Sequence, residues 1–592
     1  MDLIQNLLHA FNVSLATVVE FLNTYVVEAG IRVGEENIPY MVILLLGTGV
    51  YLTFRLGFIQ LRKLGHGFAV TSGRYDDPNE PGDVSHFQAL TTALSATVGI
   101  GNIAGVAIAI HWGGPGALFW MWVTAFLGMA TKYSEVTLAQ KYRDVDPEGG
   151  AHKWEGAVSG GPMYYIERGL GPAWKPLAVF FAGMLGFTAF LTGNAVQANT
   201  VADTMLSTFG IPVWITGLIT AGIVGTVILG GITRIGKVTA FLAPLMAFIY
   251  VSGALLIIAL NIRDFPSAFL LIFREAFNPS AGVAGVGTGV FLITLMWGVR
   301  RGLFSNEAGQ GSAPIAHAAA KTDEPVSEGV VALLEPFIDT IVICSMTGLV
   351  IIMTGLHTER LPTEIVLGGG DQTYTALEEG NHYAIVAAPD SLVIREGRHV
   401  DTGVGAPLLS WHEASVDELY IDAEMNQHFS GVVYPARNEA VSEEGRSYSS
   451  LWAMAAESGA PLTMAAFRRG LSPLGDWGHY IVLFGVLLFA ISTAISWSYY
   501  GDRCANYLFG HKLVLPYKGV FVFMHFMGAV VPLAVVWALG DVALAIVIIP
   551  NLLALILLAP QVVAETRSYF ERKPWIENAR AHQEWKRTHG KG

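Results

Sequence analysis

The chain has 592 residues, of which 52% are hydrophobic and only 14% carry a charge, and its mean hydropathy is +0.48. No soluble core is needed to bury this much apolar surface if lipid covers it, so the composition excludes an ordinary soluble protein and indicates a polytopic membrane protein. The net charge is −13, and two cysteines supply no disulfide framework.

The first 37 residues carry apolar side chains at helical spacing. We expect residues 1–37 to form an extracytoplasmic amphipathic segment that lies on the membrane surface. Because Arg32 is the first basic residue, the segment lacks the positive start of a signal peptide. The apolar positions are Leu3, Leu7, Leu8, Phe11, Leu15, Val18, Val19 and Leu22.

Eleven apolar windows are long enough to cross a bilayer. An odd number of spans places the termini on opposite sides, and a cytoplasmic C-terminus puts 25 of the 35 Lys and Arg residues inside. The positive-inside rule therefore predicts N-out and C-in. The windows run over about 38–56, 87–110, 117–138, 176–206, 212–230, 239–260, 284–304, 328–354, 479–500, 519–539 and 541–563.

One long segment, 355–478, interrupts the membrane pattern. It holds 18 acidic and seven basic residues, and therefore most of the net charge of the chain. Short β-prone runs between turn residues, such as Ser391–Ile394 and Glu418–Ile421, predict a partly β extracytoplasmic insertion. Such an insertion is either a lid or partner-docking module, or a solvated addition without a role in transport.

Glycine-rich stretches interrupt two of the apolar windows. Gly99–Gly105 contains three glycines within seven residues, and 294–302 places Gly298, Gly302 and two arginines within a span. A helix break in hydrocarbon persists only where its freed backbone faces protein or a filled cavity. If 38–56 is an accessory helix, each break lies in the first helix of a five-helix repeat. The two repeats, 86–260 and 284–563, have opposite topology, and the insertion interrupts the second. Paired breaks of this kind indicate a transporter with a site near the bilayer midplane.

Longer motifs around these breaks resemble the alanine or glycine:cation symporter family. The resemblance covers about 38–354 and 479–563, and it implies a LeuT-type fold with sodium-driven uptake of alanine or glycine. The insertion departs from the family pattern because it is longer than the usual outer connection. The matching motifs are Ala96–Val106, Gly113–Trp122, Gly128–Tyr133, Arg301–Gly309 and Trp497–Gly501.

A zwitterionic amino acid needs donors for its carboxylate and acceptors for its ammonium group. We expect the backbone amides of Gly99, Ile100 and Gly101 and the side chain of Asn102 to meet the carboxylate.

Carbonyls of Thr97 and Val98, and of Ile293 and Thr294 at the second break, would accept from the ammonium group. Gln197 either reaches the substrate or binds a neighbouring helix. The resemblance to LeuT-type transporters implies that Ile293, Met296, Trp297 and Trp497 form the walls, and large walls favour a small side chain.

Adjacent hydroxyls at Ser492 and Thr493 resemble the pair that forms a sodium site in LeuT-type transporters. The carbonyls of Ser95 and Val98 would complete this site, unless the hydroxyls bond back to their own helix. A second sodium would lie at Asn102 and Thr294.

Intramembrane acids bear on the choice between sodium and proton coupling. The breaks and the hydroxyl pair contain no carboxylate or histidine at their centres, which favours sodium. Glu335 and Asp339 share a helix face, so they either pair with Arg300 or Arg301, or serve a proton-coupled carrier. Arg300, Arg301 and Glu307, placed beyond the second break on its cytoplasmic side, are candidates for an inner gate.

The sequence therefore predicts a secondary transporter, and not an enzyme, that imports alanine or glycine with sodium by alternating access. We expect no cofactor, a multi-pass location in the cell membrane of a prokaryote, and sodium, the amino acid and the lipid bilayer as partners. A cation channel is the alternative of a different class, and paired breaks in one chain argue against it. The basic cytoplasmic tail 564–592 contacts anionic lipid or sets the topology, and does not indicate nucleic-acid binding.

Overall fold

The computed structural model describes residues 29–589 with gaps at 34–35, 78–79, 146–156, 279–290, 368–371, 378–382, 386–388, 401–407, 412–413 and 531–533, together with Phe21 and Tyr25. Most of the expected amphipathic segment 1–37 lies outside the described residues. Its last part forms an antiparallel hairpin of β1 (Gly30–Val33) and β2 (Glu36–Pro39).

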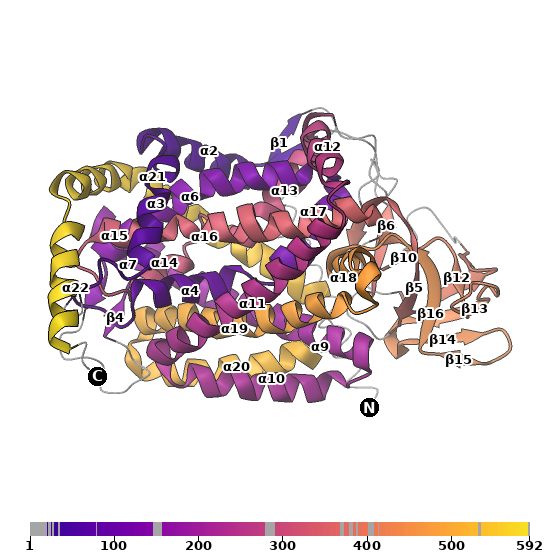
Figure 1. The fold of residues 1–592 in the computed structure, drawn as a ribbon. Helices are drawn as coiled ribbons and strands as arrows, with labels where there is room; N and C mark the ends of the chain where they lie inside the picture. The colour runs from indigo at the N-terminus through magenta and orange to yellow at the C-terminus, as the bar shows by residue number, and fades with distance from the viewer. Residues whose placement is uncertain are drawn as a thin grey trace.

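A helical bundle makes up most of the described chain (Figure 1). The wider π-helical turn is adopted by η2 (Gly101–Gly105), η3 (Tyr165–Gly169), η5 (Leu191–Ala195) and η6 (Phe337–Cys344). The α-helices are α2 (Tyr40–Arg55), α3 (Ile59–Thr71), α4 (His86–Thr97), α5 (Val106–Gly113), α6 (Ala117–Lys141), α7 (Pro162–Tyr164), α8 (Lys175–Phe190), α9 (Val196–Phe209), α10 (Val213–Ile228), α11 (Gly231–Leu260), α12 (Phe265–Phe277), α13 (Phe291–Asn306), α14 (Ala313–His317), α15 (Pro325–Ala332), α16 (Leu334–Pro336), α17 (Ser345–Thr354), α18 (Gly459–Gly470), α19 (His479–Phe509), α20 (Val514–Val530), α21 (Ala534–Arg572) and α22 (Trp575–His589).

The helices confirm a polytopic membrane protein. Among the described residues, six helices are long and apolar enough to cross a membrane, and two bent pairs raise the number of candidates to eight. Each of the eleven predicted windows contains helix, although 519–539 spans the end of α20 and the start of α21. Eleven spans, the LeuT-type arrangement and the orientation stay predictions.

The first predicted break is confirmed, at the start of the expected segment. A capping box between Ser85 and Gln88 begins α4, and the helix ends at Val98, whose ψ of 90° lies outside the helical range. The chain then turns by 55° into η2 and α5. Thr347 donates to the carbonyl of Asn102 at 2.8 Å, and Thr463 donates to that of Ile103 at 3.0 Å. Hydroxyl groups of neighbouring helices thus donate hydrogen bonds to backbone carbonyls, which lipid could not do.

The second predicted break, at 294–302, is wrong, because α13 runs through it as continuous helix. Its glycines serve close packing against α6. A Cβ atom at Gly298 would lie 2.4 Å from the carbonyl oxygen of Ala117. The chain leaves the helix only at 307–312, here called the second break, where Glu307, Gly309 and Gly311 have φ values of 53°, 91° and 78° before α14 begins. The second broken helix therefore consists of α13 and α14.

A third interruption, which the sequence analysis missed, lies within the window 176–206. There α8 ends at Leu191, η5 makes one wide turn, and α9 continues the same span. Gly193 allows this turn to touch α19, since a Cβ atom there would lie 2.3 Å from the Trp497 ring.

The insertion is confirmed as partly β. Its strands form antiparallel sheets in the orders β11-β10-β6-β7, β12-β16-β5 and β15-β14-β13-β8-β9, with their own apolar core around Ile365, Val433 and Leu451. These strands extend beyond one end of the helical bundle, and α22 lies at the other end (Figure 1). The strand bounds are β5 (Leu361–Val366), β6 (Gln372–Leu377), β7 (Tyr383–Ile385), β8 (Leu392–Arg395), β9 (Arg398–His399), β10 (Leu408–Trp411), β11 (Ala414–Ser415), β12 (Leu419–Tyr420), β13 (Gly431–Tyr434), β14 (Glu439–Ser442), β15 (Ser447–Tyr448) and β16 (Ser450–Ala455), and a further pair, β3 (Asp144–Val145) and β4 (Val158–Ser159), lies outside the insertion.

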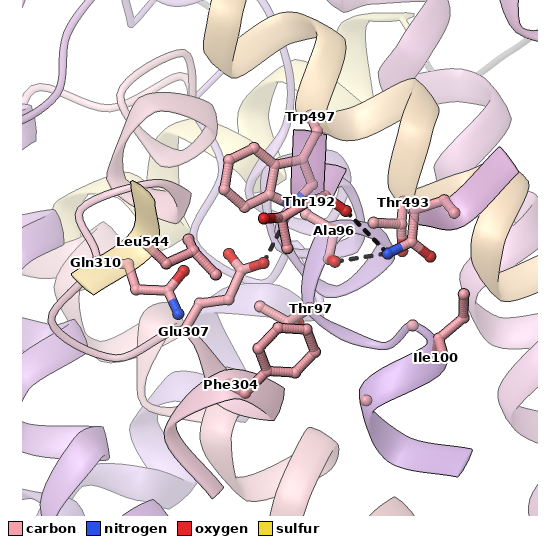
Figure 2. A pocket seen from close by; sticks show the side chains of 13 residues that line it. Ala96, Thr97, Ile100, Thr192, Phe304, Glu307, Gln310, Thr493, Trp497 and Leu544 are labelled. Atoms are coloured by element: carbon pink, nitrogen blue, oxygen red, sulfur yellow. Dashed lines mark hydrogen bonds between the residues drawn. The ribbon is translucent and has the colours of Figure 1, made fainter. Parts of the chain in front are cut away.

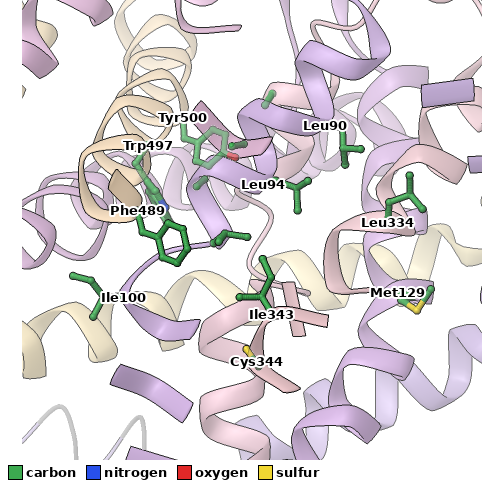
Figure 3. Packing of buried hydrophobic residues seen from close by; sticks show 14 of the residues in the cluster. Leu90, Leu94, Ile100, Met129, Leu334, Ile343, Cys344, Phe489, Trp497 and Tyr500 are labelled. Atoms are coloured by element: carbon green, nitrogen blue, oxygen red, sulfur yellow. The ribbon is translucent and has the colours of Figure 1, made fainter. Parts of the chain in front are cut away.

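The main apolar core packs α4 against α19 and the helices that follow the second break (Figure 3). Leu90 and Leu94 of α4 and Phe489 and Trp497 of α19 belong to this core. The core therefore positions the first broken helix directly beside the span that carries the hydroxyl pair.

Candidate functional site

A small cavity lies where the first break, the second break, η5 and α19 meet (Figure 2). Its free volume of about 20 Å³ is close to what one water molecule needs, so it must widen to take a small organic molecule. It is lined by Ala96, Thr97, Gly99, Ile100, Gly101, Thr192, Gln197, Phe304, Glu307, Gln310, Thr493, Trp497 and Leu544.

Half of the predicted substrate residues line this cavity. They are Thr97, Gly99, Ile100, Gly101, Gln197 and Trp497. Val98 is buried at the end of α4, and Asn102 lies behind the cavity wall, where its side-chain oxygen accepts from the Gly99 amide at 2.9 Å. The Gly99 amide is therefore taken by Asn102 in this conformation, and the expectation that it is free for a carboxylate is wrong.

The other predicted walls lie elsewhere on α13. Trp297 stacks on Trp112 of α5 with ring centres 5.9 Å apart, and Thr294 lies against Gly113. Ile293 and Met296 are half-buried on the same turns of the helix. These four residues precede Phe304 and Glu307, which do line the cavity, because the break comes later in the chain than predicted.

The predicted gate residues do not form the expected group. Arg301 lies over the rings of Trp297 and Phe304, with its guanidinium carbon 5.5 Å and 5.9 Å from their centres. Arg300 and Arg301 both precede the break, whereas they were expected beyond it. Glu307 instead accepts from the Trp497 indole at 3.1 Å and from the Ser312 hydroxyl at 2.6 Å, so its carboxylate belongs to the cavity.

The cavity wall presents unused hydrogen-bond acceptors. Within the part of the chain that the structure describes, Thr192 Oγ1, Gln197 Oε1 and Gln310 Oε1 are buried without a hydrogen-bond partner. Buried polar atoms are nearly always hydrogen-bonded, so three such oxygens around one cavity point to a ligand with several donors. Glu307 adds a buried carboxylate to the same wall.

The hydroxyl pair meets the end of α4 as predicted. Thr493 Oγ1 lies 3.1 Å from the carbonyl oxygen of Ser95 and 3.3 Å from that of Ala96. Ser492 Oγ lies 3.4 Å from Ser95 O and donates at 3.0 Å to Phe489 O, so Ser492 also bonds back to its own helix, the alternative considered from the sequence. Ala96 thus takes the place that was expected for the Val98 carbonyl. Four oxygens from two helices are the kind of ligand set that a small hard cation prefers.

The proposed partners of a second cation, Asn102 and Thr294, are not brought together. Asn102 Nδ2 donates to Asp339 Oδ1 at 2.5 Å and to Ser305 Oγ at 3.0 Å, and Ser305 donates to Asp339 Oδ2 at 2.8 Å. Thr294 lies eleven residues before Ser305 on α13, about 16 Å along a helix. Asp339 and Ser305 therefore complete the oxygen-rich group around Asn102.

Glu335 and Asp339 have different partners, and among the described residues these partners are groups other than Arg300 and Arg301. Glu335 pairs with Lys132 at 3.0 Å and also contacts His317. Asp339 joins the Asn102 group described above. The π-helix η6 carries Asp339, so the two acids are not simply one turn apart on a regular helix face.

Sequence reasoning did not find Phe304, Gln310, Thr192 or Leu544. The signal for the second break was the run Gly309, Gly311 and Pro314, which follows the motif that was noticed. The η5 turn has a weaker signal, because one glycine among polar residues is common in membrane helices. Asn194, beside it, is a helix-binding residue that donates to the Phe521 carbonyl at 2.8 Å and contacts His525.

Comparisons with known proteins match most of the chain to one family. The family described as the sodium:alanine symporter family matches residues 23–380 and 446–583, which leaves 381–445, the segment of β7 to β14, outside the match. The sodium/alanine symporter AgcS of Methanococcus maripaludis is 41% identical over 545 residues, which cover 91% of this chain and 96% of that protein.

Two proteins of Bacillus subtilis are more distant relatives. The probable sodium/glutamine symporter GlnT is 30% identical over 534 residues, covering 90% of this chain and 88% of its own. The putative sodium/proton-dependent alanine carrier protein YrbD is 29% identical over 537 residues, covering 90% of each chain. With two broken helices around a closed cavity, a hydroxyl pair at the first break and these matches, the chain belongs to the sodium:alanine symporter family, whose members are transporters and not enzymes.

Proposed function

We propose that this protein is a sodium-coupled symporter that imports alanine or glycine by alternating access. The observation that carries the proposal is the cavity wall, on which Glu307 and three unpartnered oxygens face one small space between the two broken helices. Family membership supports cation-coupled amino-acid symport, and the chemistry of the wall supports the choice of substrate.

The ammonium group of the substrate would lie against Glu307, Thr192, Gln197 and Gln310. An ammonium group has three donors, and a buried carboxylate beside it supplies the opposite charge. The carboxylate would lie against the amides of Ile100 and Gly101 at the first break. Phe304 and Trp497 leave little space for a side chain, which favours alanine or glycine over larger amino acids.

One sodium ion would be bound by the carbonyls of Ser95 and Ala96 and the hydroxyls of Ser492 and Thr493. Such an ion would tie α4 to α19 and hold the first break in shape. A second ion would be bound by Asp339, Ser305 and Asn102, with Asp339 supplying the negative charge.

Proton coupling is the competing function, and one relative has a name that includes both sodium and proton dependence. The buried acids Glu307 and Asp339 favour it. Glu335 does not, because Lys132 and His317 already occupy its carboxylate.

Transport by the purified protein in proteoliposomes tests both functions. We expect uptake of labelled alanine and glycine to require an inward sodium gradient and to persist when the proton gradient is collapsed. Unlabelled glutamine should compete poorly, although a relative is named a glutamine symporter. Uptake driven by a proton gradient in sodium-free buffer would instead establish proton coupling.

For its place in the cell, we propose the inner membrane of a prokaryote, with the insertion outside and α22 in the cytoplasm. The arrangement of these two parts at opposite ends of the bundle supports their lying on opposite sides of the membrane (Figure 1), and the bias of Lys and Arg supports a cytoplasmic α22. Addition of protease to spheroplasts should cut within 355–478 and leave an epitope placed after α22 intact.

A further inference from the structure

Two buried side chains behind the cavity wall hold the backbone of the second break. The carbonyl of Gly309 accepts from Asn551 Nδ2 at 2.8 Å, and the amide of Gly311 donates to Glu135 Oε1 at 3.1 Å. Glu135 lies on α6 and Asn551 on α21, and both side chains are completely buried. The two peptide groups on either side of Gln310 are therefore held by two neighbouring helices.

Glu135 and Asn551 also hold each other. Asn551 Nδ2 donates to Glu135 Oε1 at 2.5 Å, in addition to its bond to the Gly309 carbonyl. Tyr165, the first residue of η3, donates its hydroxyl to Asn551 Oδ1. An amide whose oxygen accepts from a hydroxyl on one side presents its two N–H donors on the other, so Tyr165 directs the Asn551 donors towards the break.

The second break needs this support because glycine gives it little stiffness of its own. Gly309 and Gly311 have φ values of 91° and 78°, a region that glycine enters at no steric cost. A side chain cannot replace either hydrogen atom, since a Cβ atom at Gly309 would lie 2.7 Å from Leu45 Cδ2 and one at Gly311 would lie 2.5 Å from Pro162 Cγ. The orientation of these peptide groups therefore depends on hydrogen bonds from outside the break.

The orientation of these peptide groups sets the direction of two cavity side chains. Gln310 and Glu307 both line the cavity, and Figure 2 shows them beside each other on one side of it. The backbone amide of Gln310 donates to the Glu307 carbonyl at 3.2 Å, so the backbone of the two residues is coupled. Among the described residues, Gln310 Oε1 has no hydrogen-bond partner, and it is one of the acceptors that the proposed function assigns to the substrate.

We propose that Glu135 and Asn551 are positioning residues for substrate binding, which hold the acceptors of Gln310 and Glu307 in place without touching the substrate. This inference rests on the proposed function, in which the ammonium group of the amino acid lies against these acceptors. Acceptors that are already oriented leave little ordering for the substrate to bring about, and such preorganisation raises affinity.

The role of Glu135 is that of a hydrogen-bond acceptor. Its Oε1 atom accepts from both the Gly311 amide and Asn551, whereas Lys132, three residues earlier on α6, forms its ion pair with Glu335. A neutral side chain with an oxygen at the same reach should therefore serve nearly as well as the carboxylate.

Binding of labelled alanine to the purified full-length protein in saturating sodium chloride tests the proposal. Glu135→Leu keeps a side chain of similar size but removes the acceptor, so we expect the Kd for alanine to rise by about tenfold or more. The rise in Tm that sodium produces without alanine should stay unchanged, because the proposed ion site at Ser492 and Thr493 lies on another helix. A loss of general stability would weaken both responses.

Ser134→Ala is the matched control. Ser134 is the neighbouring residue on α6 and is equally buried, but it donates to the Ala130 carbonyl of its own helix. The Kd for alanine should stay within about twofold of that of the intact protein, because the bonds to the break remain. If neither the intact protein nor this control binds alanine, the proposed function is wrong, because in both the support of the break is complete.

Glu135→Gln separates the acceptor from the charge. We expect a Kd for alanine within about threefold of the intact value, because the amide oxygen can accept the same two hydrogen bonds. An equal loss of affinity in Glu135→Gln and Glu135→Leu would overturn the proposed role, since the charge would then be what matters. An unchanged alanine affinity in Glu135→Leu would overturn it as well.

Tyr165→Phe tests the same support if Glu135→Leu does not fold. It removes one hydroxyl and frees the Asn551 amide to turn over, so we expect the Kd for alanine to rise by about threefold. In an Asn551→Leu background, which lacks the amide, Tyr165→Phe should have no further effect on the Kd. Effects that multiply in the double variant would show that Tyr165 and Asn551 act independently, and would overturn the proposed chain of contacts.

Discussion

At the scale of single residues, the carboxylate of Glu307 is the cavity group with the largest energetic cost of burial. It is buried, it lies on backbone with a φ of 53°, and it accepts hydrogen bonds from Trp497 and Ser312. A buried carboxylate needs a cation or strong donors nearby, and left-handed backbone at a side chain other than glycine is itself unfavourable. Under the proposed function, a substrate ammonium group would meet this need.

Glu307→Gln should weaken substrate binding with little change in folding. The amide keeps the size of the side chain, but it loses a charged hydrogen bond of about 1.5–3 kcal/mol, so the KM for alanine should rise by roughly tenfold or more. Initial uptake rates over a range of alanine concentrations measure this. An unchanged KM would remove Glu307 from the substrate site.

Thr493→Ala should raise the sodium concentration needed for half-maximal uptake. The hydroxyl lies within 3.1 Å of Ser95 O, and without it the proposed ion loses one of its ligands. Ser498→Ala is the matched control, because Ser498 is equally buried on α19 but donates within its own helix, to Ile495. Sodium titrations of uptake should separate the two variants by about tenfold, the effect of roughly 1.4 kcal/mol. Equal sodium dependence in both would contradict the ion site.

At the scale of elements, wide π-helical turns and close glycines shape the site. η2 begins at the cavity residue Gly101, η5 contains the cavity residue Thr192, and η6 carries Asp339. A π-helical turn disturbs the regular backbone bonding of a helix and is often found at functional sites. Glycine then allows the disturbed turn to approach its neighbour, as Gly193 does at Trp497.

Gly193→Ala should impair transport and lower stability. The added Cβ atom would lie 2.3 Å from the Trp497 ring, and such overpacking costs about 1–3 kcal/mol. Gly183→Ala, one element earlier on α8, is the control, because nothing lies within 4 Å of its Cβ position. Thermal unfolding and alanine uptake should be altered in the first variant and nearly unchanged in the second. Normal uptake by Gly193→Ala would show that Trp497 can move away freely.

Outside the membrane spans, docking of α22 should depend on pH. Asn578 of α22 donates to Glu80 at 3.1 Å, and burial raises the pKa of Glu80 from 4.5 to about 7. The raised pKa means that the docked state favours protonated Glu80. The contribution of Glu80 to the stability of the docked state is therefore complete below about pH 4.5 and is lost as the pH rises through about 7.

Hydrogen exchange of α22 measures this effect. After correction for the intrinsic exchange rate, α22 should be less protected at about pH 8 than at about pH 6. Glu80→Gln should reduce the difference. Equal protection at both pH values would mean that Glu80 has no part in docking.

At the scale of the whole molecule, the strands of 355–478 form a unit of their own beside the helical bundle. The insertion has its own apolar core, and 381–445 lies outside the family match. It joins the bundle near the first break, since Glu457 contacts Thr363 and its carbonyl lies 3.2 Å from His111 Nδ1. The helix that follows, α18, supplies the Thr463 hydroxyl to the Ile103 carbonyl.

Replacing 381–445 by a short flexible linker should leave transport within about twofold of the intact protein, because tolerance to deletion follows from how few bonds of the core are removed. The contacts of Glu457 and α18 with the bundle lie outside the deleted stretch, as does the bond between Thr363 and Glu457. Alanine uptake and sodium dependence measure the outcome. A large loss of uptake, with normal membrane insertion, would show that the insertion acts as a lid.

Part of the site could be predicted because its signals are local. Gly99, Ile100 and Gly101 interrupt an apolar run, and Ser492 and Thr493 are adjacent hydroxyls in the middle of one, so each is visible within a few residues. Gly298 and Gly302 gave the same signal at 294–302 but serve packing against α6, because glycine permits both a break and a close contact. Only the neighbouring helix decides between the two.

By itself the sequence determined the class of protein, the helical windows, the acidic β insertion, the first break and the hydroxyl pair, since hydropathy and short-range composition encode these features. Tertiary structure alone decided where the second break lies, that Glu307 rather than Trp297 lines the cavity, and that Asp339 joins Asn102. It also decided that His86, Glu328 and His317 meet, although 242 positions of sequence separate the first two. The physical reason is that contacts between helices depend on their rotation and on every side chain between them, and no local pattern carries that information.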